Sequence, residues 1–310
     1  MKTRLISLLA MLLAASCSNQ PSIPKPAAPP SSRPAPALVQ VENDPLSHPQ
    51  YGLQKADLVY EYLTEGSITR FTLVYMSPQG GDRVEPVRSA RLITLRVQKA
   101  YQGVLFYSGA SDHVLGMIND QHVPSFSESS GYFQRDSSRR APHNLYTTLD
   151  QLKQGVEKSG QTVTYDLPKS GEPAGQGDAA MKFSFQQTPS HNVSYSYSDG
   201  DRAYTYSYED GSMSDAGTGK PVAITNVVLV RVAHHAAGYT EDVAGAEGID
   251  FDFQGSGPAE LYTRGKHFSA TWDLSGGPLR LLGKDGQPLA LPSGLTWIHL
   301  VDPDTQVSAG

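Results

Sequence analysis

The chain has 310 residues and a formal net charge of −6 at pH 7, from 25 lysines and arginines against 31 aspartates and glutamates. Nucleic-acid-binding proteins gather positive charge toward the phosphate backbone, so this acidic balance argues against nucleic acid as a partner. The single cysteine, Cys17, excludes an internal disulfide and any metal site built on cysteine pairs.

The N-terminal sixteen residues have the layout of a secretory signal. Two basic residues come first, an apolar stretch from Leu5 to Ala15 follows, and small residues stand directly before Cys17. The apolar stretch falls short of the about 18 residues that indicate a membrane-spanning helix, and no other segment reaches that length. The sequence Leu13-Ala14-Ala15-Ser16-Cys17 resembles a bacterial lipobox. We therefore predict a signal peptide over residues 1–16 and lipid on Cys17, which would anchor an exported lipoprotein to the extracytoplasmic side of a membrane. The alternative is an ordinary secreted protein in which the cysteine stands by chance.

The rest of the chain divides by composition. Proline, serine and alanine dominate residues 17–40, which have too few large apolar groups to form a core, so we predict a semi-rigid tether there. A proline-rich ligand for a partner is the alternative for this stretch. The remaining residues are numerous enough for two domains. We predict an α+β fold, with an N-terminal α/β sandwich-like domain over residues 41–165, a Gly/Pro-rich linker over 166–182 and a mainly antiparallel β domain over 183–303.

Three strands are expected in the N-terminal domain. β-Branched and aromatic residues indicate strands at 58–60, 71–75 and 104–107. Successive side chains of a strand point to opposite faces. Glu61 would therefore face away from the tyrosines on either side of it, and we expect it to point outward.

Three helices are expected between and after these strands. The spacing of apolar residues predicts an amphipathic helix over 91–101, with Ser89 as its N-cap, and a second helix through 114–118. Thr148 and Gln151 have the spacing of a capping box. A third helix is therefore expected to begin at Thr148.

Tyrosines alternate with small polar residues in the second half, at 195–197 and 204–208. Each set lies on one face of a strand, because alternate residues share a face. We interpret these faces as parts of a core; a surface that stacks on sugars is the alternative. Asp-Gly pairs indicate hairpin turns at 199–200, 210–211 and 285–286, and apolar runs predict further strands at 227–232 and 296–301.

Arginines concentrate between residues 70 and 140, in three polar loops of the N-terminal domain. A guanidinium beside a helix N-terminus offers paired donors to phosphate or carboxylate, and the helix N-terminus itself stabilises an anion. The alternative for each arginine is surface charge or a structural ion pair. The predicted anion-binding residues are Arg70, Arg88, Ser89, Arg91, Arg135, Arg140 and Asn144.

His143, Asp136 and Glu65 are the candidate acid–base groups if the protein is an enzyme. A structural, hydrogen-bonding role is the alternative for His143. The sequence lacks the motifs of zinc proteases, serine hydrolases and phosphate-binding loops, and the adjacent His234 and His235 would point to opposite faces of a strand. We therefore expect no metal and no cofactor.

Six segments carry a family resemblance: His48–Glu61, Glu65–Arg70, Pro86–Arg91, Arg135–Tyr146, Gly265–Trp272 and Gly294–Ile298. In this order, over residues 43–301, they resemble the YerB-like lipoprotein family. Ser67 stands where that family usually has a second glycine, and Tyr51 where a small polar residue is common.

This resemblance implies a lipoprotein precursor with two family-defined domains. It implies no activity, because the function of the family is unknown. It marks as motif positions Arg70, Arg88, Arg91, Arg135, His143 and Asn144.

Three functions are open at this point. The first is binding of an anionic envelope ligand, such as a cell-wall glycan or a phosphorylated precursor, through the arginine-rich site. The second is an enzyme that acts on such a ligand by phosphoryl or glycosyl transfer or hydrolysis, because arginines stabilise developing negative charge. The third is a protein-interaction scaffold that uses the β domain, and the sequence indicates no particular protein partner.

Overall fold

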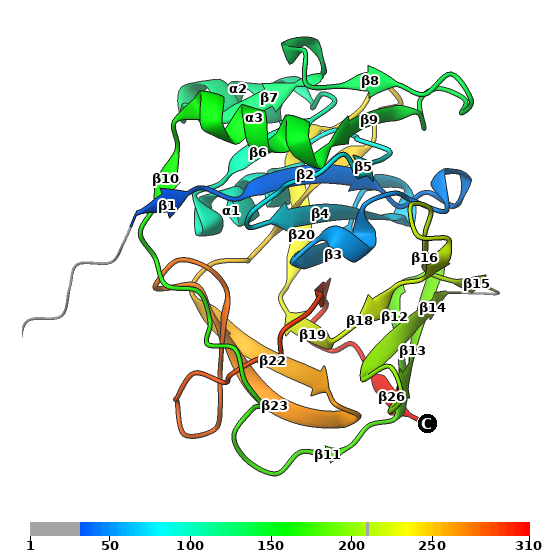
Figure 1. The fold of residues 1–310 in the computed structure, drawn as a ribbon, viewed down its shortest axis with the longest axis vertical. Helices are drawn as coiled ribbons and strands as arrows, with labels where there is room; N and C mark the ends of the chain where they lie inside the picture. The colour runs from blue at the N-terminus through cyan, green and yellow to red at the C-terminus, as the bar shows by residue number, and fades with distance from the viewer. Residues whose placement is uncertain (1–31, 209–210) are drawn as a thin grey trace, which may run out of the picture. The chain divides into compact units, whose positions relative to one another are not determined.

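One eleven-stranded sheet runs through both halves of the chain (Figure 1). The structure, a computed structural model, describes residues 32–208 and 211–310, so the predicted signal peptide, Cys17 and Asp210 of one predicted turn lie outside the described residues. In spatial order the strands are β11 (Asp178–Ala179), β23 (Lys266–Asp273), β22 (Ser256–Thr263), β19 (Asn226–Arg231), β25 (Thr296–Val301), β3 (Leu58–Leu63), β4 (Thr69–Tyr75), β2 (Ala37–Glu42), β6 (Val104–Tyr107) and β7 (Ser125–Ser127), with β24 (Arg280–Leu282) paired to β23.

The two halves of the chain meet inside this sheet. β25 pairs in parallel with β3, where Ile298 lies opposite Tyr60, and in parallel with β19, where Ile298 lies opposite Val228. The strand predicted at 296–301 is thus confirmed, and it lies between the two halves. The predicted N-terminal and C-terminal domains share one sheet, and residues 31–310 form one compact unit.

Helices cover both faces of the N-terminal part of the sheet. They are α1 (Leu92–Tyr101), α2 (Asp112–Asp120) and α3 (Leu149–Ser159). Along β2, Val39 and Val41 belong to the core that contains α3, whereas Leu38 belongs to the core that contains α1 and α2. This layering and the predominance of strands agree with the predicted α+β class.

The predicted starts of two helices differ in outcome. Thr148 accepts a hydrogen bond from the Gln151 N–H at 3.3 Å, and Gln151 Oε1 accepts one from the Thr148 N–H, so the predicted capping box is confirmed. The prediction that Ser89 caps α1 is wrong. The N-cap is Arg91, whose N–H donates to Thr94 Oγ1 at 2.9 Å, because the chain stays extended for two residues beyond Ser89.

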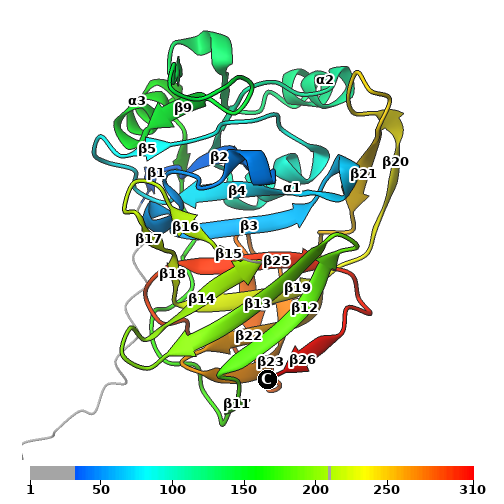
Figure 2. The same ribbon diagram turned by 90° about the vertical axis from the view of Figure 1, so that its right-hand side faces the viewer.

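A second sheet of six strands packs across one face of the large sheet (Figure 2). Tyr195, Tyr204 and Tyr206 are almost fully buried between the two sheets, so the core interpretation of the tyrosine pattern is confirmed for them. The Asp199–Gly200 pair lies in the turn between the two tyrosine strands, as predicted. The strands are β15 (Gly211–Ser212), β14 (Ala203–Tyr208), β13 (His191–Ser198), β12 (Lys182–Thr188) and β26 (Val307–Ala309) in order, with β18 (Ala223–Ile224) paired to β14.

The predicted tether extends too far into the chain. β1 (Arg33–Pro34) pairs with β10 (Thr162–Val163), and all of β2, from Ala37 onward, is buried. A strand buried on both faces usually shows a continuous apolar run, but here the run is only Ala37–Val39, since Gln40 interrupts it and prolines stand before it. The folded part therefore begins before residue 40.

The remaining elements are short, apart from a hairpin in the C-terminal half. No helix of the described residues has the length and apolar character needed to cross a membrane. The strands are β5 (Arg83–Val84), β8 (Gln134–Arg135), β9 (Leu145–Thr148), β16 (Ser214–Asp215), β17 (Lys220–Pro221), β20 (His234–Thr240) and β21 (Glu247–Phe251), and the 3₁₀ turns are Pro45–Ser47, Leu53–Lys55, Glu65–Ser67 and Glu128–Ser130.

Candidate functional site

The predicted anion-binding residues lie near one end of the sheet, but most of them are held in ion pairs. Arg91 donates two hydrogen bonds to the Glu65 carboxylate, one of them from Nε to Oε2 at 2.8 Å. Its Nη1 lies 3.3 Å from Glu241. Arg70 lies 3.5 Å from the same Glu65 and donates to the Ser89 carbonyl at 3.1 Å. Burial opposes ionisation of Glu65, but the hydrogen bond from Arg91 and the charge of Arg70 outweigh it and lower its pKa to about 2. Both arginines are thus neutralised inside the protein.

A second group joins Arg88 and His143 to a carboxylate that the sequence did not single out. Glu42 lies at the carboxyl end of β2 and is buried. Its Oε1 is 3.0 Å from Arg88 Nε, and its Oε2 is 2.6 Å from His143 Nδ1. One ring nitrogen of His143 is therefore held by a buried carboxylate.

A third group lies in the loop around residue 136. Arg135 pairs with Glu128 and donates to Asn144 Oδ1 at 2.8 Å. Asp136 accepts from Ser138 and, at 2.5 Å, from Arg83. The bonds from Ser138 lower the pKa of Asp136 to about 2, and Arg83 adds to this effect. Arg135 and Arg83 are thus each balanced by an acid.

Arg140 is the exception among the predicted arginines. Its side chain is exposed and makes no hydrogen bond or ion pair within residues 32–208 and 211–310. It lines a hollow of about 620 Å³ together with His143 and Arg139. Arg139 is held in place, because its Nη2 donates to the carbonyl of Pro49 at 2.8 Å. We call this the basic hollow; its lining residues are Leu46, His48, Arg139, Arg140, Ala141, Pro142 and His143.

A second, smaller hollow of about 170 Å³ lies on the other side of His48. His48 donates from Nε2 to Asn43 Oδ1 at 2.8 Å, and its Nδ1 accepts from the Tyr208 hydroxyl. Burial, with a smaller effect of His191, lowers the pKa of His48 to about 4, so this ring is neutral at pH 7. We call this the polar hollow; its lining residues are Asn43, Pro45, His48, Ser67, Ile68, Thr69, Ser190, His191 and Tyr208.

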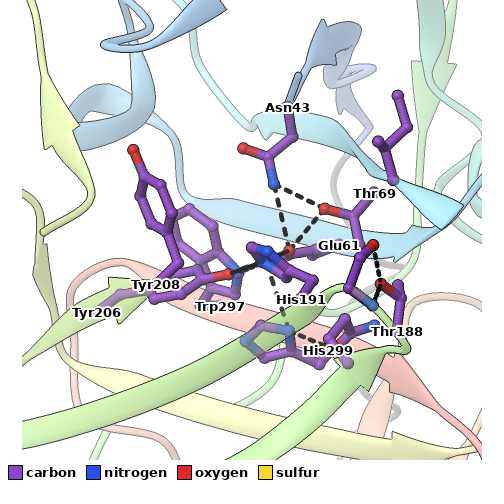
Figure 3. Close-up of polar contacts among 12 residues, drawn as sticks. Asn43, Glu61, Thr69, Thr188, His191, Tyr206, Tyr208, Trp297 and His299 are labelled. Atoms are coloured by element: carbon purple, nitrogen blue, oxygen red, sulfur yellow. Dashed lines mark hydrogen bonds and ion pairs between the residues drawn. The ribbon is translucent and has the colours of Figure 1, made fainter. Parts of the chain in front are cut away.

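A fully buried carboxylate, Glu61 of β3, lies beneath the polar hollow (Figure 3). It accepts hydrogen bonds from Thr69 Oγ1 at 2.8 Å and from Trp297 Nε1 at 2.8 Å. His191 and His299 each lie 3.4 Å from its oxygens. Burial alone would raise the pKa of Glu61, but the two histidines and the bond from Thr69 outweigh it and lower the pKa to about 2. Glu61 is therefore an ionised carboxylate surrounded by hydroxyl and indole donors and by two imidazoles.

The partners of Glu61 come from strands of both halves of the chain. Thr69 belongs to β4 of the large sheet. His191 and Tyr206 belong to β13 and β14 of the second, six-stranded sheet, which we call the tyrosine sheet. Trp297 lies on β25, and its indole N–H bond to Glu61 spans 236 residues of sequence. The cluster thus ties the two sheets together below the polar hollow.

The comparisons with known proteins agree with this two-part construction. Residues 24–162 match the family described as "Protein of unknown function (DUF3048) N-terminal domain", and residues 181–298 match its C-terminal domain. The chain is 30% identical over 292 residues to the Bacillus subtilis (strain 168) protein named "Putative lipoprotein YerB", covering 88% of this chain and 83% of that one. It also resembles the crystal structure of the YerB protein from Bacillus subtilis, with a TM-score of 0.73, 28% identity, and coverage of 88% of this chain and 93% of that one.

The chain belongs to the YerB-like family. The relative's name fits a lipoprotein, in agreement with the lipobox-like sequence that ends at Cys17. The family description names no activity.

The expectation that Glu61 points outward is wrong. Alternation along β3 correctly places Glu61 on the face opposite Tyr60 and Tyr62, but that face is covered by the tyrosine sheet. A carboxylate within a strand otherwise rich in aromatic residues was the available signal, because an interior strand can hide both of its faces. His48 and His191 gave no signal, since neither stands at a recognisable ligand spacing.

Proposed function

We propose that this YerB-like lipoprotein, anchored by lipid on Cys17 outside the membrane, binds an anionic ligand of the cell envelope in the basic hollow. The observation that carries this proposal is Arg140, an exposed guanidinium with no partner among the described residues, in a hollow that it shares with Arg139 and His143. A guanidinium offers paired N–H donors that match the oxygens of phosphate or carboxylate. The ligand is therefore a phosphate- or carboxylate-bearing glycan or precursor.

The neighbours of Arg140 are set in place before any ligand arrives. Arg139 donates to the carbonyls of Ser47 and Pro49, at 3.3 and 2.8 Å, and its Nη1 is buried without a hydrogen bond inside the described chain. His143 is oriented by Glu42. Groups that are already ordered lose little conformational entropy on binding, so they contribute more of their interaction energy to affinity.

Calorimetric titration of the full chain in detergent tests the proposal. The probes are inorganic phosphate, glycerol 3-phosphate and N-acetylglucosamine 1-phosphate. Arg140→Gln should weaken binding of the phosphorylated probes by about tenfold, or about 1.4 kcal/mol. The matched control is Arg202→Gln, which removes an exposed arginine in the turn between β13 and β14, where it pairs with Glu172, and should leave affinity unchanged. Equal affinity of wild type and Arg140→Gln for every probe would show that the basic hollow is not the site.

The lipid anchor is tested separately. Cells that express the wild-type chain should incorporate an alkyne-labelled fatty acid into it, and Cys17→Ser should abolish this label. Labelling of Cys17→Ser at the wild-type level contradicts lipid on this residue.

The contact between His143 and Glu42 favours a second function, hydrolysis of the bound ligand. A carboxylate at 2.6 Å fixes the Nδ1 proton, which leaves Nε2 as a proton acceptor in the hollow that the ring lines. His143 would take the proton of a water as its oxygen bonds to phosphorus, the old P–O bond would break on the opposite side, and solvent would protonate the leaving oxygen. Under this function, His143→Ala stops release of phosphate from the probes while their binding survives. Binding without turnover by the wild-type protein excludes it.

A further inference from the structure

The polar hollow has no part in the proposed anion contact, and its chemistry differs from that of the basic hollow. Within residues 32–208 and 211–310, its polar groups are hydroxyls, one amide and two imidazoles, and no lysine, arginine or carboxylate of these residues lines it. His48 forms the wall that it shares with the basic hollow. A ligand that reaches both hollows therefore carries an anionic part on one side of His48 and an uncharged, hydroxyl-bearing part on the other.

We propose that the polar hollow binds one neutral polyhydroxylated ring, a single sugar residue of a glycan. The hollow has a volume of about 170 Å³, close to the liquid volume of about six water molecules, which is the size of one such ring. This inference deepens the proposed function, because the sugar residue would belong to the ligand whose anionic group lies in the basic hollow.

Aromatic rings form one wall of this hollow. The rings of His48 and Tyr208 meet edge to face with centroids 4.7 Å apart, and that of His191 lies 6.0 Å from Tyr208. Tyr208 stands at the end of the tyrosine pattern of β14 and is only partly buried, unlike Tyr204 and Tyr206. Burial in the core leaves no room for stacking on a sugar at Tyr195, Tyr204 and Tyr206, whereas the ring of Tyr208 is accessible for it. An aromatic ring with a polar edge suits a sugar, whose C–H face is apolar and whose rim is polar.

Ser67, which also lines the hollow, is hydrogen-bonded by residues of the C-terminal half. Ser67 is exposed and has a φ of 59°, a left-handed conformation that is uncommon for residues other than glycine. Its carbonyl accepts hydrogen bonds from Thr188 Oγ1 at 2.9 Å and from Ser190 Oγ at 3.0 Å. A strained residue persists where its surroundings over-determine it, and such residues cluster at binding sites. These bonds fix the backbone of Ser67 beside Ser190, and both residues line the hollow.

Glu61 explains why the floor of the hollow is rigid. Thr69 and His191, which line the hollow, are both tied to this buried carboxylate, and Asn43 donates to Thr69 at 2.6 Å. Side chains fixed by a supporting layer of hydrogen bonds hold their geometry without a ligand. Glu61 is therefore a positioning residue in this proposal and touches no ligand itself.

Ser67→Gly and Tyr208→Phe test the hollow with little risk to the fold. Glycine adopts a positive φ without steric cost, so Ser67→Gly removes a rim hydroxyl while the melting temperature should not fall. Tyr208→Phe keeps the aromatic ring and removes the hydroxyl. The matched control is Tyr146→Phe, which removes an exposed hydroxyl that donates to Gln134 and lines neither hollow.

Saturation-transfer NMR on the full chain in detergent detects neutral probes, namely glucose, N-acetylglucosamine, ribitol and their methyl glycosides where these exist. We expect at least one probe to receive saturation, and both hollow variants to weaken it by about tenfold while Tyr146→Phe does not. Arg140→Gln should leave the neutral probe bound and weaken only the phosphorylated one.

Two outcomes overturn the inference. One is that no neutral probe binds; the other is that Ser67→Gly and Tyr208→Phe both bind neutral probes like the wild type. Either result leaves the anion proposal standing if Arg140→Gln still weakens the phosphorylated probes. If Arg140→Gln has no effect while the hollow variants do, the anion proposal fails and the sugar site stands.

Discussion

Glu61 and Glu65 are four residues apart in the sequence, yet the fold stabilises their charges in different ways. Glu61 has no exposed side-chain surface and is surrounded by neutral donors from Thr69, Trp297 and Tyr206. Glu65 is 14% exposed and sits between the guanidinium groups of two arginines. Burial opposes ionisation of both carboxyls; the charge of His299, with His191 and Thr69, outweighs it at Glu61, and two arginines outweigh it at Glu65, so both pKa values are lowered to about 2.

The different surroundings of the two carboxylates suit them to different roles. The charge of Glu61 fixes the orientation of the hydroxyl and indole groups that donate to it. Such a fixed network suits a rigid floor under a binding site. A carboxylate between arginines leaves the group near neutral and mainly joins structural elements. Here Glu65 links β4 to the start of α1, and Arg91 extends the link to Glu241 after the β20 strand.

The largest expected effect is that of Glu61→Gln. The amide replaces an acceptor by a donor among groups that already donate, so buried N–H and O–H groups lose their partner. We expect the free energy of unfolding to fall by about 3–5 kcal/mol, the range for breaking a buried charge network. Urea denaturation followed by tryptophan fluorescence measures it. Glu157→Gln, on the exposed face of α3 where Glu157 pairs with Lys153, is the matched control. A loss below about 1 kcal/mol for Glu61→Gln would contradict the role assigned to this cluster.

Glu65→Gln should have a smaller effect, of about 2–3 kcal/mol, because Glu241 remains beside Arg91 and the site is partly open to water. The loss arises from leaving Arg70, which is buried, without its opposite charge. Adding Arg70→Met to Glu65→Gln should recover part of this loss, since the unpaired charge of Arg70 is then removed. Full additivity in a double-mutant cycle would show that the two side chains are not coupled.

Local features of the fold could be predicted from the sequence, because each depends on neighbours a few residues away. The capping box of Thr148 and Gln151, the extent of α1 and the burial of Tyr195 and Tyr206 all follow from short-range spacing. The motif arginines were identified too. Whether an arginine is free or already paired depends on acids elsewhere in the chain, such as Glu241 for Arg91, and this could not be read from the motif.

The Glu61 cluster could not be predicted, because its partners come from segments far apart in the sequence. His191 and Trp297 reach Glu61 only once β25 has paired in parallel with β3 and the tyrosine sheet has covered that face. Parallel pairing carries no local signal, since no tight turn connects the two strands. The outward orientation expected for Glu61 failed for this reason.

Acid sensitivity should separate the polar hollow and the Glu61 cluster from the Glu65 cluster. The pKa values of His48 and His299 are lowered by burial to about 4, below the unfolded value of 6.5. The unfolded chain therefore binds more protons between these values, and stability is lost as the pH falls from about 6.5 to 4, by on the order of 3 kcal/mol per histidine. The carboxyls of Glu61 and Glu65 stabilise the fold above their unfolded pKa of 4.5, and that stability is lost from there down to about pH 2.

Urea titrations at a series of pH values resolve these two phases. His48→Gln should flatten the phase between pH 6.5 and 4, and Glu65→Gln should flatten only the lower phase. The exposed His235, 54% accessible, supplies the control variant His235→Gln. If His48→Gln leaves the upper phase as steep as in the wild type, the ring is not held neutral by its burial.

The smallest expected effect is that of salt. Interactions between partly exposed charges are screened at high ionic strength, whereas bonds between a buried carboxylate and neutral donors are screened much less. Raising sodium chloride from 0.05 to 1 M should therefore reduce the stability that Glu65 contributes by less than about 1 kcal/mol and leave the contribution of Glu61 unchanged. The measurement is the difference in unfolding free energy between wild type and each Gln variant at the two salt concentrations.

If salt changes this difference as much for Glu61→Gln as for Glu65→Gln, pairing with opposite charges, and not bonding to neutral donors, stabilises Glu61 at neutral pH.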